Sequence, residues 1–147
     1  MRIEWLILAD AAQVVGEKLY LLGGGWDRLT VNTEFPLVHP IALAMSCKVP
    51  WIETNQKHDI ELEVTDQDHT DILARLDVGL EVGRLPGMEP GTEQRAQLAA
   101  SFPIKIEKPG LYEINARIKN SDAPSERITL TVVPGPLLAM RMNQGGA

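Results

Sequence analysis

The stretch IALAMSCKV (residues 41–49) decides the fold class, because large apolar side chains alternate along it with small or polar ones. Successive side chains of a strand point to opposite faces of a sheet. A period of two residues therefore places Ile41, Leu43, Met45, Cys47 and Val49 on one face. The pattern predicts a strand with one face buried in a core.

The same alternation recurs along the chain, in stretches separated by Gly and Pro turns. These stretches are 3–15, 19–24, 26–31, 41–49, 58–64, 72–82, 96–106, 111–120 and 127–133. No heptad, no βαβ alternation and no internal repeat accompanies them. The sequence therefore predicts an all-β fold, a two-sheet antiparallel β-sandwich of about eight to nine strands, immunoglobulin-like or jelly-roll-like.

The first two stretches predict a long hairpin over 3–24, with its turn at Gly16-Glu17-Lys18. A short helix over 9–15 is the alternative, since Ala and Gln favour helix. The glycines at 23–25 predict a bend, after which WDRLTV (26–31) is a corner or a strand that changes sheets.

The length of 147 residues is typical of one domain. We expect a single β-sandwich domain over 1–136 and a partly disordered C-terminal tail over 137–147. The apolar tail residues either cap the domain's own core or dock on a second subunit. They are Leu137, Leu138, Met140 and Met142.

The formal charge of −6 and the pI near 5.0 argue against diffuse attraction to nucleic acid or to an anionic membrane. The single cysteine, Cys47, excludes an intrachain disulfide, and its place in an alternating strand predicts a buried side chain. The apolar start WLILA (5–9) is too short to span a bilayer and lacks the features of a secretory signal. We expect a cytoplasmic protein.

Catalytic and cofactor motifs are missing from the sequence. The glycine triplet precedes a strand-like segment rather than the helix that a phosphate loop requires. The three histidines lack metal-ligand spacing, and no G-x-S-x-G element occurs. The D-x-D-x-x-D of Asp66, Asp68 and Asp71 fits a solvated turn better than a calcium loop. We therefore expect no enzyme, no cofactor and no metal site.

The Pro- and Gly-rich segment 83–94 and the GGGWD bend are the best candidates for binding, because loops carry binding residues more often than strands do. The candidate partner-binding residues are Trp26, Asp27, Arg84, Leu85, Pro86 and Met88. The leading hypothesis is a module that binds another protein or its own copy. A carbohydrate- or calcium-assisted ligand site, with a platform of Trp5, Trp26 and Trp51, is the alternative, and an enzyme of unrecognised type is the second.

Three segments together resemble a family of small bacterial proteins of unknown function, found widely in actinobacteria. They are LADAAQVVGEKLYLLGGGWDRL (8–29), VPWIETNQKH (49–58) and EVGRLPGMEPGT (81–92). The resemblance covers most of the chain and implies a compact β-sandwich in a bacterial cytoplasm. It implies no activity, cofactor or catalytic residue.

Overall fold

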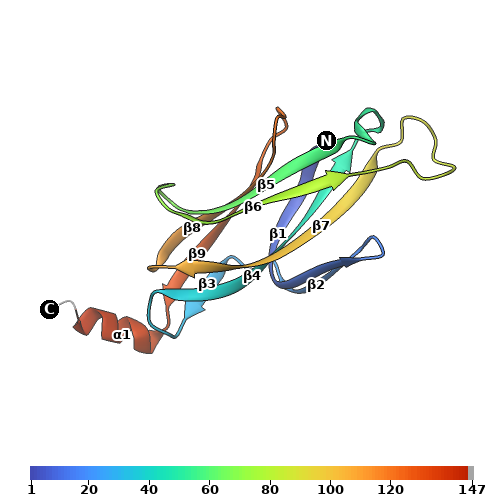
Figure 1. Cartoon of the computed structure of the whole chain (residues 1–147). Coiled ribbons are helices and arrows are strands. Elements are labelled where there is room, and N and C mark those ends of the chain that lie inside the picture. Colours follow the sequence, from blue (N-terminus) through green and yellow to red (C-terminus); the bar gives the residue numbers. More distant parts are fainter. Residues whose placement is uncertain (146–147) are drawn as a thin grey trace.

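Nine strands and one short helix make up the computed structural model, which describes residues 1–145 (Figure 1). The elements are β1 (Arg2–Val15), β2 (Lys18–Gly24), β3 (Arg28–Val31), β4 (Leu37–Val49), β5 (Lys57–Asp66), β6 (Ile72–Glu81), β7 (Gln94–Ile106), β8 (Gly110–Ile118), β9 (Glu126–Pro134) and α1 (Pro136–Gln144). A single turn of 3₁₀-helix, η1 (Trp51–Glu53), follows β4.

Two sheets face each other across one core. One sheet has the strand order β2-β1-β4-β7 and the other β3-β9-β8-β5-β6. The predicted sandwich is confirmed, with one refinement: β3 pairs with β9 in parallel, whereas all other neighbours are antiparallel. The chain changes sheets between β2 and β3, as the glycine bend predicts.

The core is built from the alternating residues of the central strands. Ile41, Leu43, Met45, Cys47 and Val49 are all buried on β4. Facing them are the buried alternate residues of β5 and β8, which are Ile60, Leu62, Val64, Tyr112, Ile114, Ala116 and Ile118. Burial raises the pKa of the Cys47 thiol to about 11, as expected of a cysteine that packs as a small hydrophobic residue.

The other face of β4 is buried too, which the alternation does not predict. Ala42, Ala44 and Ser46 are each 0% exposed. This face is covered by the hairpin of β1 and β2. β1 pairs with β4 only as far as Ala9, and from Ala9 onward it pairs with β2. The predicted hairpin is therefore confirmed, but only over 9–24 rather than 3–24.

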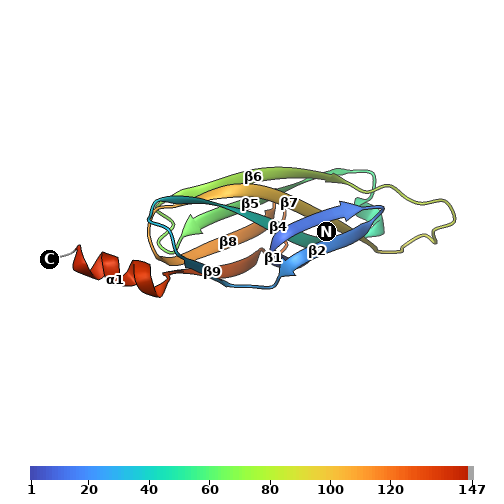
Figure 2. The same cartoon turned by 90° about the horizontal axis from the view of Figure 1, so that it is seen from below.

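This hairpin bends back over the outer face of β4 and β7 (Figure 2). The tip of the hairpin contacts β7, where the Gln97 Nε2 donates a hydrogen bond to the Glu17 carbonyl at 3.3 Å. The small side chains of Ala42 and Ala44 let the hairpin approach closely. As a result β4 becomes the central layer of a locally three-layered structure.

The helix α1 extends from the far end of the sandwich (Figures 1 and 2). The sequence indicates only a tail there; Leu138 is buried against the core, whereas Leu137 is 77% exposed. The expected disorder of the last residues falls partly on Gly146 and Ala147, outside the described residues. Within residues 1–145, no helix has the length and apolar character needed to cross a bilayer.

Candidate partner-binding groove

The loop 82–93 between β6 and β7 consists of two turns in tandem. Leu85-Pro86-Gly87-Met88 closes with a hydrogen bond from the Met88 N–H to the Leu85 carbonyl, at 3.2 Å. Glu89-Pro90-Gly91-Thr92 repeats this bond at 3.2 Å. Gly87 has φ +82° and Gly91 φ +88°. Proline second and a positive-φ glycine third define type II turns, so the loop is locally rigid.

The root of the loop is fixed by Arg84. Its guanidinium stacks on the Trp51 ring at 3.9 Å from the centroid. The Nε donates to the Thr54 Oγ1 at 2.7 Å, and an Nη donates to the Trp51 carbonyl at 2.9 Å. Beside it, the Asn55 N–H donates to the Val82 carbonyl at 2.7 Å. These contacts join the loop to η1 and the segment that follows it.

A groove of about 580 Å³ separates this loop from the tip of the β1–β2 hairpin. Its walls are Leu85 and Met88 on the loop side and Val14, Gly16 and Glu17 on the hairpin side. Its floor is the start of β7, residues 94–97. Leu85 is 57% exposed, so an apolar side chain stands in water at the rim.

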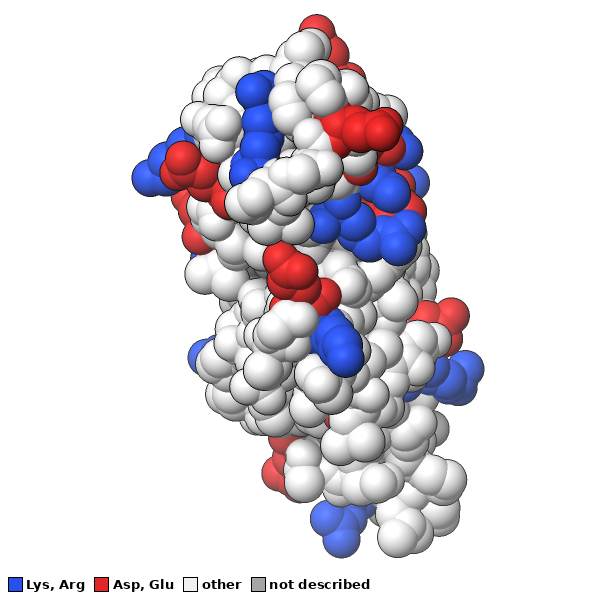
Figure 3. All heavy atoms as spheres, turned by 90° about the vertical axis from the view of Figure 1, so that its right-hand side faces the viewer, with Lys and Arg blue, Asp and Glu red and all other residues white. Residues whose placement is uncertain are grey.

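Charged residues of both signs surround the groove. Figure 3 shows this end of the molecule, where blue and red side chains alternate around uncharged surface. Arg2 pairs with Glu93 at 2.7 Å, and Arg95 pairs with Glu4 at 2.8 Å. The rim is therefore polar but not dominated by one charge, as in many protein–protein interfaces.

Glu4 is the most strongly held of these carboxylates. It occupies an irregularity of β1, between Ile3 and Trp5. Hydrogen bonds from Arg95 and from the Ser46 hydroxyl lower its pKa to about 2. Likewise, the hydrogen bond from Arg2 lowers the pKa of Glu93. Both carboxylates therefore serve to anchor the strands beside the groove.

The structure brings four of the six predicted residues together and separates the other two. Arg84, Leu85, Pro86 and Met88 share the loop. Trp26 and Asp27 follow β2, at the opposite end of the hairpin from its tip; a strand of seven residues spans roughly 20 Å.

Trp26 itself packs against the core. Its indole N–H is buried and has no hydrogen-bond partner among residues 1–145. The Asp27 carbonyl accepts a bond from the Thr131 N–H at 2.8 Å, which ties the bend to β9. Both residues thus have structural contacts at the point where the chain changes sheets.

The features behind the ligand-binding alternative are scattered. Trp5 lies on β1, Trp26 at the bend, and Trp51 on η1 with Arg84 over its ring. The Asp66 carboxylate accepts bonds from the Thr70 and Asp71 amides at 2.7 and 3.2 Å. In the part of the chain that the structure describes, no group of three His, Cys, Asp or Glu side chains could hold a metal ion.

Sequence reasoning missed the hairpin side of the groove and the partners of Arg84. The sequence predicts Val14 as a strand residue and Gly16 and Glu17 as part of a turn. Their approach to loop 82–93 depends on the hairpin bending back. In contrast, the repeated Pro-Gly pairs in LPGM (85–88) and EPGT (89–92) were a local signal for tandem type II turns.

Solved structures similar to this chain include the CARDB domain of the PF1109 protein from Pyrococcus furiosus, in complex with di-metal ions. It shares 14% identity over 74% of this chain and 86% of that one, with a TM-score of 0.42. A β-glucosidase from Listeria innocua, in complex with gluconolactone, shares 12% identity over 73% of this chain and 14% of its own length, with a TM-score of 0.36.

No curated protein matches the chain. A family model does match it, over residues 4–133, and this range includes both walls of the groove. The chain belongs to a family of unknown function, DUF6941.

Proposed function

We propose that this protein is a non-enzymatic interaction module that binds a segment of a protein partner in the groove between loop 82–93 and the hairpin tip. The observation that carries the proposal is the preorganised loop. Two type II turns and the Arg84 clamp hold Leu85 at the rim before any partner arrives. A prearranged surface loses less conformational entropy on binding, so more of the contact energy becomes affinity.

The composition of the groove favours a polypeptide ligand. Leu85, Met88 and Val14 offer apolar contacts, and the polar floor includes Gln94 and Gln97. Moreover, β7 is an edge strand of its sheet, so among residues 1–145 alternate backbone groups of β7 have no partner strand. An extended segment could use these backbone groups and place apolar side chains against Leu85.

Selection from a displayed library of random peptides tests this proposal. We expect peptides selected by the unchanged chain to bind the Leu85→Glu variant at least about tenfold more weakly, a loss of 1.4 kcal/mol. Leu137→Glu is the matched control, because Leu137 is 77% exposed on α1 at the other end of the molecule. Equal affinity for Leu85→Glu and the unchanged chain would overturn the proposal.

A further inference from the structure

The outer edge of β2 is an unprotected strand edge. Natural edge strands are usually short or carry charges, prolines or bulges that prevent pairing with another chain. β3 has only four residues, β6 carries Arg75 and Asp77, and β7 carries Pro103 in its second half, away from the groove at residues 94–97. Between Lys18 and Gly24, by contrast, β2 reads Leu-Tyr-Leu-Leu-Gly without a charge or a proline.

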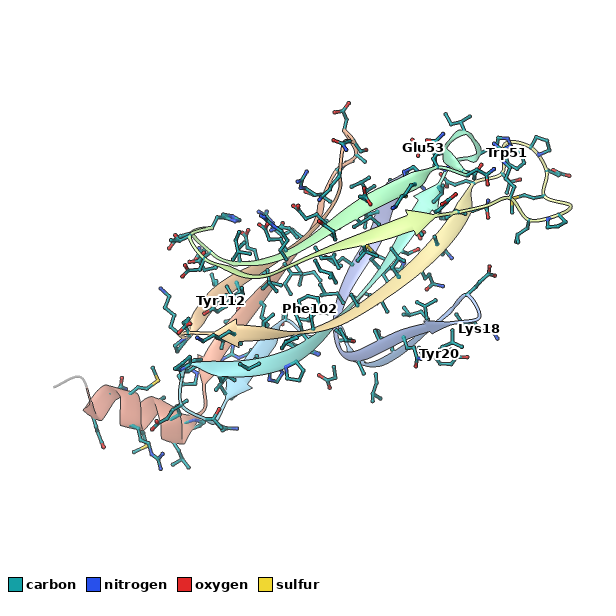
Figure 4. All side chains as sticks on the ribbon, in the orientation of Figure 1. Lys18, Tyr20, Trp51, Glu53, Phe102 and Tyr112 are labelled. Carbon is teal, nitrogen blue, oxygen red and sulfur yellow. The ribbon has the colours of Figure 1, made fainter. Side chains whose placement is uncertain are left out.

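The same strand exposes large apolar side chains. Tyr20 is 57% exposed and Leu22 72% exposed, and both project from one face of the hairpin. Figure 4 shows Tyr20 and Lys18 pointing away from the body of the sandwich, apart from Trp51 and Glu53. Val15, opposite Lys18 on β1, is 50% exposed.

The turn determines which backbone groups face outward. Gly16 (φ +55°) and Glu17 (φ +63°) form a two-residue turn of type I′. In such a hairpin the flanking residues, Val15 and Lys18, exchange both hydrogen bonds. By alternation, the backbone groups of Tyr20 and Leu22 also face β1. Those of Leu19 and Leu21 therefore face outward along the open edge.

We infer that β2 pairs antiparallel with β2 of a second copy of this chain, about a two-fold axis at Tyr20. Leu19 then exchanges two hydrogen bonds with Leu21 of the second copy, and the symmetry repeats this pair. The two Tyr20 side chains lie opposite each other, and Leu22 faces Lys18 of the second copy.

This register suits a second copy for two reasons. Every directly opposed pair from 18 to 22 is apolar or joins an aliphatic side chain to the lysine stem, and no like charges oppose each other. The register also ends before Gly23, whose φ of +58° departs from an extended strand. Because the contact is confined to one short strand, we expect a weak, concentration-dependent dimer.

Disulfide trapping tests the register directly. Opposed residues of a non-hydrogen-bonded pair have Cα atoms about 4.5 Å apart, within the range that a disulfide bridges. We expect oxidised Tyr20→Cys to form a covalent dimer of twice the 16.2 kDa mass. Leu22→Cys is the matched control. Leu22 lies on the same face as Tyr20, but in this register the Leu22 residues of the two copies are four positions apart along the strand, roughly 13 Å.

A mixture of Lys18→Cys and Leu22→Cys chains should form a linked dimer that neither chain forms alone. The native Cys47 is 0% exposed and does not compete. Thermal unfolding of each variant checks that the fold is retained. The inference is overturned if Tyr20→Cys and Leu22→Cys cross-link equally, or if the mixture links no better than its components. Peptide binding to the groove is a separate readout, so it is judged independently of this result.

Discussion

At the scale of single residues, Arg84 anchors the loop that forms one wall of the candidate groove. It joins loop 82–93 to Trp51 by a stacked guanidinium and two hydrogen bonds. A cation–π contact at an exposed site contributes about 0.5–1 kcal/mol, and a hydrogen bond contributes a similar amount. The rigidity of the loop therefore depends on a contact between Arg84 and the Trp51 carbonyl, which are 33 positions apart in the sequence.

We predict that Arg84→Ala lowers the free energy of unfolding by about 1–2 kcal/mol, through loss of these contacts. Amide exchange should accelerate across 83–93, and Trp51 emission should shift to the red because its ring loses its cover. Arg75→Ala, which removes a surface ion pair with Glu63, is the control and should lower the free energy of unfolding much less than Arg84→Ala does. Unchanged exchange in the loop would show that Arg84 does not hold it.

The lowered pKa of Glu4 predicts how the free energy of unfolding depends on pH. Its folded-state pKa of about 2 lies below the ordinary value of 4.5. A depressed pKa gives a stabilising contribution that is present above the unfolded-state value and is lost as the pH falls toward 2.

The advantage of the unchanged chain over Glu4→Gln should therefore be full above pH 5 and should shrink as the pH falls from 4.5 to 2. Urea unfolding at several pH values measures it. Glu89→Gln is the control, since Glu89 forms no ion pair within residues 1–145. A difference between unchanged chain and Glu4→Gln that stays constant down to pH 2 would contradict the assignment of the Arg95 and Ser46 contacts.

At the scale of elements, the folding back of the β1–β2 hairpin is the feature that the alternating pattern could not predict. The pattern places Ala44 on the solvent side of β4, where a larger residue would be tolerated. The structure buries Ala44 completely beneath the hairpin. We predict that Ala44→Leu costs about 1–3 kcal/mol, because extra methylene groups have no room there.

Ser101→Leu is the control for this substitution. Ser101 is the cross-strand neighbour of Ala42, on the same outer face, but it borders open space beside the hairpin. Its replacement should change the free energy of unfolding by no more than about 0.5 kcal/mol. Chemical denaturation compares the two, and equal effects would mean that the hairpin does not cover β4 closely.

Local sequence patterns account for most of the fold. The features that the sequence did not predict depend on contacts between residues far apart in the chain. The burial of Ile41, Leu43 and Met45 follows from the period of two alone. Pro103, which lacks an amide donor, agrees with the edge position of β7, although β4 is an inner strand and also contains a proline. The groove does not follow from any local pattern, since its hairpin wall and its loop wall are about seventy residues apart in the sequence.

At the scale of the whole molecule, α1 and β2 offer two different routes to self-association, and they can be separated. The tail exposes Leu137 and Met140, which the sequence leaves as either a cap or a docking surface. The structure places Leu138 of the same helix in the core. The helix is thus at least a cap, whatever else contacts its outer face.

Truncation after Gly135 decides between the two routes. We predict a loss of about 1.5–3 kcal/mol in the free energy of unfolding, the burial energy of one leucine side chain. In the full chain, Leu138→Ala should reproduce most of this loss, and Leu137→Ala should not. Covalent dimerisation of Tyr20→Cys should persist in the truncated chain, because β2 lies apart from α1 (Figure 1). If truncation abolished the dimer while the fold was retained, the helix rather than the strand edge would join the two copies.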